Sequence, residues 1–318
     1  MTLNIVAIMR EPERSTFALD RLARDHAGVA VHVAQDFAEA QPHLAQADVI
    51  ITLGLHLGAD AGATFTKAKR LKWVQSFGSG TDNIKGHIAL ASDVAVTNVH
   101  GIHGAQLAEA AFAGMLHFAR CSSAFAHDQA LRQWRRHVPS TLNGQTVGIF
   151  GLGAIANAIA PRCAAFGMRV IGISGTARDV SGFARVFSRN DLEAAVAELD
   201  YLILLTPHTP HTHHMVSSDV FAAMKPNAYL INLARGGVVD ETALLVALDT
   251  GQIAGAALDV FETEPLPMEH PLWTHPKVMI TPHTAGFHAG YADDAYAMIS
   301  DNVGRYLAGG TAALINKV

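Results

Sequence analysis

The chain has 318 residues, of which 50% are hydrophobic and 16% are charged, and its formal net charge is −5. It contains no run of Lys and Arg, which argues against nucleic acid or an anionic membrane as a partner. The N-terminus lacks the pattern of a signal peptide, and no apolar stretch approaches the ~20 residues of a membrane span. With only Cys121 and Cys163, a disulfide scaffold is not expected. We therefore expect a cytoplasmic protein of about two domains.

Short apolar runs alternate with helical patterns along the whole chain, and this alternation predicts an α/β fold with parallel sheets. In the first third, strands are expected at Asn4–Met9, Val29–Val33, Val49–Leu53, Trp73–Ser76 and Val94–Thr97. Helices are expected between them, for example at Ser15–Asp25 and Thr64–Arg70. The βα turns of this part carry no Gly-x-Gly-x-x-Gly pattern.

The rest of the chain repeats this alternation after two helices that are rich in Ala, Phe, Leu and Met. The helices are expected at Ala105–Ala119 and Ser122–Arg135. The strands that follow are expected at Thr146–Phe150, Arg169–Ile173, Tyr201–Leu205, Tyr229–Asn232, Ala256–Val260 and Val278–Ile280. A final helix is expected from about Tyr291 to Leu307. Two groups of strands predict two domains, and we place their boundary near Asn98–Gly104.

A glycine motif follows the expected strand at residues 146–150. Its sequence is Gly151-Leu152-Gly153-Ala154-Ile155-Ala156, and it continues into a helix-forming segment that runs to Phe166. This order is that of the βα turn of a dinucleotide-binding fold. Gly151 permits a tight turn, Gly153 lets the backbone approach a pyrophosphate, and Ala156 lets the helix pack on the strand. The free N–H groups and the dipole of the helix start then face the phosphates.

The next strand ends at Ser174, about 20 residues beyond the glycines, where an NAD-binding protein usually has Asp or Glu for the ribose 2′-hydroxyl group. This chain has Ser174-Gly175-Thr176-Ala177-Arg178 instead. A carboxylate would repel the extra phosphate of NADP, whereas hydroxyl groups and a guanidinium accept it. We therefore predict NADP, with NAD possible, and place Ser174, Thr176 and Arg178 around the 2′-phosphate. The alternative is an ordinary polar turn in a protein with loose cofactor choice.

Three later segments each follow an expected strand, at the sheet edge where ligands of open α/β sheets bind. They supply Arg235 before a Gly-Gly turn, three carboxylates among residues 259–264, and His283. Arg, Glu and His from neighbouring strand ends suit hydride transfer to a 2-oxo acid. Arg235 pairs with the substrate carboxylate, His283 donates a proton to the developing alkoxide, and Glu264 holds the ring and favours imidazolium. The alternative for each residue alone is a structural ion pair or a surface His.

In their order along the chain, these motifs resemble those of the D-isomer-specific 2-hydroxyacid dehydrogenase family. The matching segments are Gly78-Ser79-Gly80-Thr81-Asp82, Asn98 through Glu109, Gly151-Leu152-Gly153-Ala154-Ile155, Met224-Lys225-Pro226, Asn232-Leu233-Ala234-Arg235-Gly236, Leu258-Asp259-Val260-Phe261, Glu264-Pro265 and Thr281-Pro282-His283. They run from residue 78 to residue 286, whereas residues 1–70 match only in their strand and helix pattern. Ala156 in place of a third Gly and Ser174 in place of Asp depart from the family pattern.

The resemblance implies a fold of two doubly wound parallel-sheet domains, in which a Rossmann nucleotide-binding domain is inserted into a flavodoxin-like substrate domain. Residues 1–98 and 290–318 then form the substrate-binding domain, and residues 99–289 form the NAD(P)-binding domain. Family members are commonly dimers, which implies a homodimer through the helices at 105–135.

The resemblance also implies which residues form the site. Arg235, Glu264 and His283 are implied as the catalytic trio, Gly78-Ser79-Gly80 as the backbone that binds the substrate carboxylate, and Asp259 as a residue that approaches the nicotinamide amide. The whole set of expected cofactor contacts is Gly151, Gly153, Ala154, Ile155, Ser174, Thr176, Arg178, Thr206, Pro207, Ala234 and Asp259. No metal is expected. His208, His211, His213 and His214 crowd one loop, but their spacing matches no metal site.

These features predict an oxidoreductase that transfers a hydride between NAD(P)H, with NADPH favoured, and a small 2-oxo acid, giving a D-2-hydroxy acid. Glyoxylate or hydroxypyruvate is the expected substrate. Formate dehydrogenase shares the fold and the Arg but carries Gln where Glu264 stands, so we disfavour it. The alternative outside enzymes is a nucleotide-sensing corepressor or regulator that keeps the fold without turnover.

Overall fold

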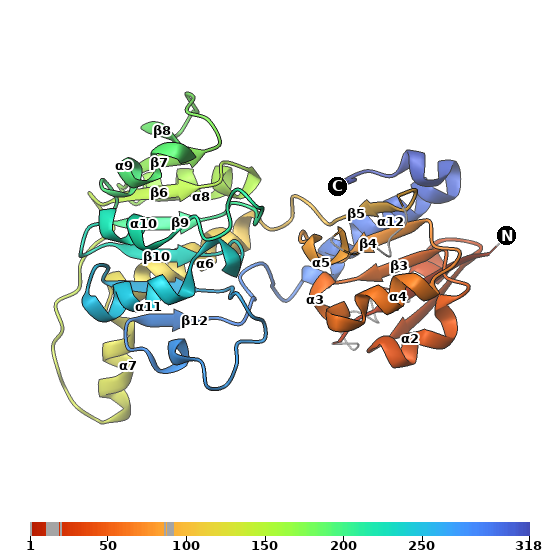
Figure 1. Cartoon of the computed structure of the whole chain (residues 1–318), viewed down its shortest axis with the longest axis horizontal. Helices are drawn as coiled ribbons and strands as arrows, with labels where there is room; N and C mark the ends of the chain where they lie inside the picture. The colour runs from red at the N-terminus through yellow and green to blue at the C-terminus, as the bar shows by residue number, and fades with distance from the viewer. Residues whose placement is uncertain (1, 11–18, 20, 86, 88–91) are drawn as a thin grey trace. The chain divides into compact units, whose positions relative to one another are not determined.

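The structure is a computed structural model, and it describes residues 2–10, 19, 21–85, 87 and 92–318. The chain divides into two compact units, each with its own sheet (Figure 1). Unit 1 comprises Met1–Ile102 and His288–Val318, and unit 2 comprises His103–Phe287. Within the described part of the chain, we find no helix with the length and apolar character needed to cross a membrane.

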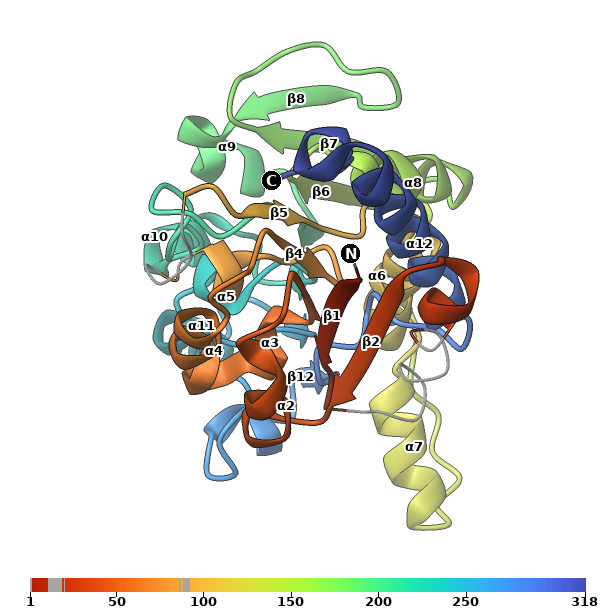
Figure 2. The same cartoon turned by 90° about the vertical axis from the view of Figure 1, so that its right-hand side faces the viewer.

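Unit 1 holds a five-stranded sheet in the order β2-β1-β3-β4-β5, in which every pairing is parallel (Figure 2). Its strands are β1 (Leu3–Ile8), β2 (Val29–Ala34), β3 (Val49–Thr52), β4 (Trp73–Ser76) and β5 (Ala95–Thr97). Its helices include α2 (Phe37–Leu44), α3 (Gly54–Leu57), α4 (Ala61–Lys67), α5 (Asp82–Lys85) and α12 (Tyr291–Gly309).

Both faces of this sheet are covered, as a parallel sheet requires. Because side chains alternate between the faces of a strand, Ile5 and Ile51 pack with α12, whereas Val6 and Ile50 pack with α2 and α4. The sheet is therefore the buried middle layer of unit 1.

Unit 2 holds a seven-stranded parallel sheet in the order β12-β11-β10-β9-β6-β7-β8. Its strands are β6 (Thr146–Phe150), β7 (Arg169–Ser174), β8 (Arg185–Ser188), β9 (Tyr201–Leu204), β10 (Tyr229–Asn232), β11 (Gly255–Leu258) and β12 (Val278–Ile280). Its α-helices include α6 (Gly104–Ala119), α7 (Ser122–Ala130), α8 (Ala154–Ala165), α9 (Leu192–Val196), α10 (Ser218–Ala223) and α11 (Glu241–Thr250). Helices α6 and α8 cover one face of the sheet, and α9, α10 and α11 cover the other (Figure 1).

The strand order of unit 2 reverses at β6, because β7 and β9 flank it on opposite sides. Ligands of doubly wound sheets bind beyond the carboxyl ends of the strands at such a switch point. The segments that follow β6, β7, β9, β10, β11 and β12 therefore share one edge of the sheet.

The structure confirms the predicted fold class, and the strands expected at 73–76, 146–150, 229–232 and 278–280 have the predicted bounds. The other expected strands and the helix expected at 64–70, which is α4, have bounds that differ by one to three residues. Two larger differences are found. The helix expected at 122–135 ends at Ala130, because Arg132 takes a left-handed φ of 55° and the chain turns back, so that His137 and Arg135 reach the buried Asp128 carboxylate. Strand β8 was not expected. Residues 11–18 and 20 of the region expected to hold the first helix lie outside the described part.

Candidate active site

Arg235 lies in a turn after β10 that is fixed by the buried side chain of Asn232. The Asn232 Oδ1 atom accepts a hydrogen bond from the Ala234 N–H at 3.1 Å, and its Nδ2 atom donates to the Arg235 carbonyl at 3.2 Å. A Cβ atom on Gly236 would lie 1.8 Å from the carbonyl carbon of Phe261. Only glycine allows this approach, so the Arg235 turn presses directly on the segment that follows β11.

Glu264 and His283 come from the segments after the neighbouring strands β11 and β12, and they form a hydrogen-bonded pair. The distance from His283 Nδ1 to Glu264 Oε2 is 2.6 Å, and the other carboxylate oxygen accepts the Phe261 N–H at 2.9 Å. The His283 side chain is 35% exposed and the Glu264 side chain is 29% exposed. With Nδ1 bound to the carboxylate, Nε2 is the ring atom left to exchange a proton with a substrate.

The charges around Glu264 favour its ionised form. Burial opposes ionisation, but the hydrogen bond and charge of His283, the Phe261 N–H and the charge of Arg235 outweigh it and hold the pKa of Glu264 below its usual value. The charges of Arg235 and His283 therefore both act on the Glu264 carboxylate within unit 2.

Asp259 organises the segment that carries His283. Its buried carboxylate accepts hydrogen bonds from the Thr281 hydroxyl, the Thr284 N–H at 2.9 Å and the Ala285 N–H at 3.0 Å. The Asp259 carbonyl also accepts the His283 N–H at 2.7 Å. The approach of Asp259 to a nicotinamide stays a prediction, and its carboxylate is already held by three donors of this segment.

Two of the supporting residues were not singled out from the sequence. The Asn232 side chain holds the backbone of the Arg235 turn, and the Thr281 hydroxyl donates to the Asp259 carboxylate, which holds the His283 segment. Asn232 is the last residue of β10 and Thr281 directly follows β12, and a polar residue at a strand end is the sequence signal that would have marked them.

The glycine turn after β6 fits a dinucleotide. Gly151 has a φ of +107°, and a Cβ atom there would lie 2.7 Å from the Leu205 carbonyl carbon and from the Thr206 nitrogen. A Cβ atom on Gly153, in contrast, would meet no atom within 4 Å. Gly153 is the N-cap of α8, and no side chain in the described residues caps this helix. Free N–H groups with space in front of them suit a pyrophosphate.

The turn after β7 exposes neutral and basic groups. Ser174 is buried, and its hydroxyl donates to the Thr176 carbonyl at 2.7 Å, so Ser174 shapes the turn. Thr176 and Arg178 are exposed. Residues 174–178 contain no carboxylate side chain, and the next residue, Asp179, is exposed.

The remaining expected contacts lie at three places. Thr206 is buried beside Gly151, and Pro207 is exposed in the same segment. Ala234 is buried next to Arg235. Ala154 and Ile155 form the first turn of α8.

The turn Gly78-Ser79-Gly80 belongs to unit 1, where it follows β4. Asn98 Nδ2 donates to the Ser79 carbonyl at 2.8 Å, and the Ser76 hydroxyl donates to the Gly80 carbonyl at 2.9 Å. The Gly78 N–H donates to the Ser76 hydroxyl at 3.3 Å, and among the described residues the Ser79 and Gly80 N–H groups make no hydrogen bond. The turn is suited to bind an anion through its backbone.

The histidines of the 208–214 loop contact each other and Glu262. His208 Nε2 lies 3.1 Å from His213 Nδ1, and His214 Nε2 lies 2.7 Å from Glu262 Oε1. In the residues that the structure covers, no three His, Cys, Asp or Glu side chains are arranged to hold a metal ion.

Comparisons with known proteins agree with this architecture. The profile described as "D-isomer specific 2-hydroxyacid dehydrogenase, NAD binding domain" matches residues 112–285, which is more than half of the chain. Glyoxylate/hydroxypyruvate reductase A of Photorhabdus laumondii is 36% identical over 202 residues, which cover 64% of this chain and 64% of that protein. The chain thus matches somewhat less than two thirds of the length of that relative.

Two solved structures match nearly the whole length. A D-isomer specific 2-hydroxyacid dehydrogenase family protein from Aeromonas salmonicida has a TM-score of 0.89 and 30% identity, with 100% of this chain and 99% of that chain covered. The NADPH-dependent glyoxylate/hydroxypyruvate reductase of Sinorhizobium meliloti, solved with NADP and sulfate, has a TM-score of 0.85 and 28% identity, with 100% and 98% covered. The fold, the motifs and these matches together show that the chain belongs to the D-isomer-specific 2-hydroxyacid dehydrogenase family.

Proposed function

We propose that the protein reduces small 2-oxo acids to D-2-hydroxy acids, with NADPH as the favoured hydride donor. The observation that carries this proposal is the Glu264–His283 pair, at 2.6 Å, in the electrostatic environment of Arg235. A carboxylate, an imidazole with a free Nε2 atom and a guanidinium are the groups that reduction of a carbonyl next to a carboxylate requires.

Each member of the trio has one task in this reaction. Arg235 binds the substrate carboxylate and polarises the neighbouring carbonyl. His283 delivers a proton from Nε2 to the carbonyl oxygen as the carbonyl carbon is reduced, and Glu264 orients the ring through Nδ1 and stabilises its protonated form. NADPH supplies the hydride when bound. The backbone of Gly78-Ser79-Gly80 provides a second anchor for the substrate carboxylate.

The cofactor site of the proposal lies along the turns after β6 and β7. Gly153 and the start of α8 receive the pyrophosphate, and Thr176 and Arg178 receive the 2′-phosphate. The Sinorhizobium meliloti relative, which was solved with NADP, supports the choice of NADP as the nucleotide. In this proposal the cofactor site lies in unit 2.

Glyoxylate and hydroxypyruvate are the substrates that we propose first, because relatives in both the sequence and the structure comparisons are named as their reductases. The test is the oxidation of NADPH and of NADH, followed by absorbance, with glyoxylate, hydroxypyruvate, pyruvate and phenylpyruvate. We expect turnover with at least one of the first two acids and a higher kcat/KM with NADPH. Binding of NADPH without oxidation by any acid would instead indicate a nucleotide-sensing regulator.

We also propose that the chain forms a homodimer through α7 and the segment 131–141. Apolar side chains are exposed along this part of unit 2: Phe125 (38%), Leu131 (50%), Trp134 (94%) and Val138 (93%). Large apolar side chains gathered on one surface are typical of protein interfaces. Light scattering after size-exclusion chromatography should give the mass of two chains, and the double variant Trp134→Ser, Val138→Ser should shift it to the mass of one.

A further inference from the structure

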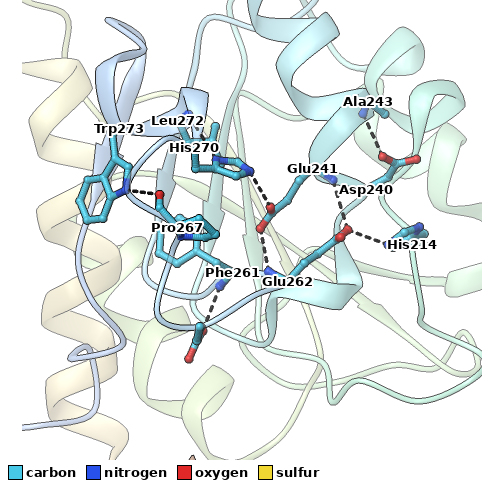
Figure 3. Close-up of polar contacts among 11 residues, drawn as sticks. His214, Asp240, Glu241, Ala243, Phe261, Glu262, Pro267, His270, Leu272 and Trp273 are labelled. Carbon is cyan, nitrogen blue, oxygen red and sulfur yellow. Dashed lines mark hydrogen bonds and ion pairs between the residues drawn. The ribbon is translucent and has the colours of Figure 1, made fainter.

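The first residue of α11 is bound to the segment that carries Glu264. The Glu262 N–H donates to Glu241 Oε1 at 2.7 Å, and in return the Glu241 N–H lies 3.4 Å from Glu262 Oε1 (Figure 3). Glu241 and Glu262 are 21 residues apart in the sequence. This exchange of backbone donors and carboxylate acceptors fixes the start of a helix and the active-site segment to each other.

Glu241 is held in a place that disfavours a charge. Its side chain is only 13% exposed, and its second oxygen, Oε2, lies 3.5 Å from His270 Nε2. Burial raises the pKa of Glu241, as do the charges of Glu262 and Glu264, whereas the Glu262 N–H and His270 oppose this rise. The contacts of Glu241 with charged and polar groups are thus made to His270 and to the segment around Glu262.

The bond at Glu262 is two residues from Glu264, and the backbone that precedes Glu262 is tightly restrained. The Phe261 N–H donates to Glu264 Oε1 at 2.9 Å, and the backbone around Phe261 and Glu262 packs against Gly236. When the Glu262 N–H is held, the adjacent Phe261 residue is held as well, and with it the donor that orients the Glu264 carboxylate. The remaining oxygen of Glu264 then faces His283 at 2.6 Å.

We propose that Glu241 is a positioning residue, whose carboxylate holds the Glu262 N–H and thereby keeps Glu264 at hydrogen-bonding distance from His283. This inference rests on the proposed function, because it assumes that the Glu264–His283 pair supplies the proton. Glu241 itself contacts neither of these two side chains in any hydrogen bond of the described residues, so it acts through the backbone.

Three variants test the proposal by steady-state kinetics. Glu241→Ala removes the acceptor, Glu241→Gln keeps an acceptor oxygen without the charge, and Asp240→Ala removes the N-cap of the same helix, whose carboxylate accepts the Ala243 N–H at 2.9 Å. Because small displacements of a catalytic group cost up to about 10²-fold in rate, we expect Glu241→Ala to lower kcat roughly 10- to 100-fold. The KM values for NADPH and for the 2-oxo acid should stay within about twofold, since binding groups are untouched.

The other two variants separate positioning from helix stability. Glu241→Gln should recover kcat to within about threefold of the wild type, and Asp240→Ala should keep kcat while lowering Tm, because a lost N-cap costs only helix stability. Wild-type kcat in Glu241→Ala would overturn the proposal. So would an equal loss of kcat in Asp240→Ala, since the effect would then come from the helix. If Glu241→Ala does not fold, Glu241→Leu fills the same volume without an acceptor and takes its place.

Hydrogen exchange of the Glu262 amide, measured by NMR, reports on its hydrogen bond to Glu241 and does not require enzyme activity. We expect protection in the wild type and in Glu241→Gln and faster exchange in Glu241→Ala. If the wild type reduces no 2-oxo acid, the proposed function fails whatever the exchange rates are. If the wild type is active but Glu262 stays protected in Glu241→Ala, the positioning inference alone fails.

Discussion

Two parts of unit 2, for which we propose different ligands, differ in how densely their side chains are hydrogen-bonded. The turns after β6 and β7 present backbone N–H groups, empty space and exposed side chains, as Gly153 and Arg178 illustrate. The segments after β10, β11 and β12 are dense with side-chain hydrogen bonds, of which those of Asn232, Asp259 and Glu264 are examples. In the proposed function, the first part receives a large ligand and the second keeps a few reacting atoms in fixed positions.

This contrast follows from the chemistry of each task. A dinucleotide supplies its own charge and shape, so its site needs N–H groups and room. A proton donor must keep a fixed direction, because misplacement by about 1 Å lowers the rate strongly. Substitutions in the two parts should therefore fail in different ways, and the following predictions are ordered by the size of the expected effect.

Arg235→Ala should give the largest loss. Loss of one protein group that stabilises the charge on a reacting carbonyl oxygen typically lowers kcat about 10²- to 10³-fold. Because the substrate carboxylate also loses its binding partner, we expect kcat/KM to fall about 10³-fold. Arg178→Ala is the matched control, since it removes the same charge from the nucleotide turn. Its kcat with saturating cofactor should stay near that of the wild type. A loss below tenfold in Arg235→Ala would remove Arg235 from the trio.

Two alanine variants in the same glycine turn should have different effects: Gly151→Ala should lower stability, and Gly153→Ala should weaken NADPH binding. A methyl group at Gly151 meets the backbone at 2.7 Å with a φ of +107°, and we expect a loss on the order of 1–3 kcal/mol in the free energy of unfolding. A methyl group at Gly153 meets no protein atom. Its variant should unfold like the wild type but bind NADPH roughly tenfold more weakly, as for one lost hydrogen bond to a charged group. Urea unfolding and fluorescence titration check the two outcomes, and equal effects on both quantities would contradict them.

Ser174→Asp should reverse the choice of nucleotide. A carboxylate at this position repels a 2′-phosphate and accepts a ribose hydroxyl group, so NADPH should bind about tenfold more weakly and NADH no worse. The ratio of kcat/KM for the two nucleotides measures this directly. A wild type that already prefers NADH would refute the assignment of Thr176 and Arg178.

The smallest expected effect is on stability at acid pH. The folded-state pKa of Glu264 lies below its unfolded value of about 4.3, so its stabilising contribution is present above that value and is lost as the pH falls through the lower folded pKa. Urea unfolding of the wild type and of Glu264→Gln should therefore differ most near neutral pH. The two free energies of unfolding should converge below about pH 4, and a constant difference from pH 7 to pH 3 would speak against the lowered pKa.

The sequence predicted those parts of the molecule that depend on short-range patterns. The bounds of β6 and β10 follow from their apolar runs, and the glycine turn follows from its spacing. The meeting of Glu264 with His283 was predicted from strand ends that share an edge of the sheet, whereas the order of the strands was not predicted. The pair itself is found at 2.6 Å, and its catalytic role remains a prediction.

Contacts between distant residues and short irregular features escaped prediction. Strand β8 is a four-residue strand at the sheet edge. Helix α7 ends earlier than expected because Asp128 is bound by His137, which lies nine positions after it. The bond between Glu241 and the Glu262 N–H joins residues that carry no shared pattern in the sequence. Such bonds depend on tertiary packing, which local propensity does not encode.

The measurement that tests the central claim most directly compares proton transfer with nucleotide binding in His283→Ala. A general acid contributes about 10²- to 10⁴-fold to the rate, so NADPH oxidation by the best 2-oxo acid should fall by at least about 10²-fold. The Kd for NADPH, measured by its fluorescence, should change by less than about twofold, because the nucleotide turns are untouched. His275→Ala, which removes a histidine paired with Asp249 elsewhere in unit 2, is the control and should keep the wild-type rate. Turnover close to that of the wild type in His283→Ala would contradict the account.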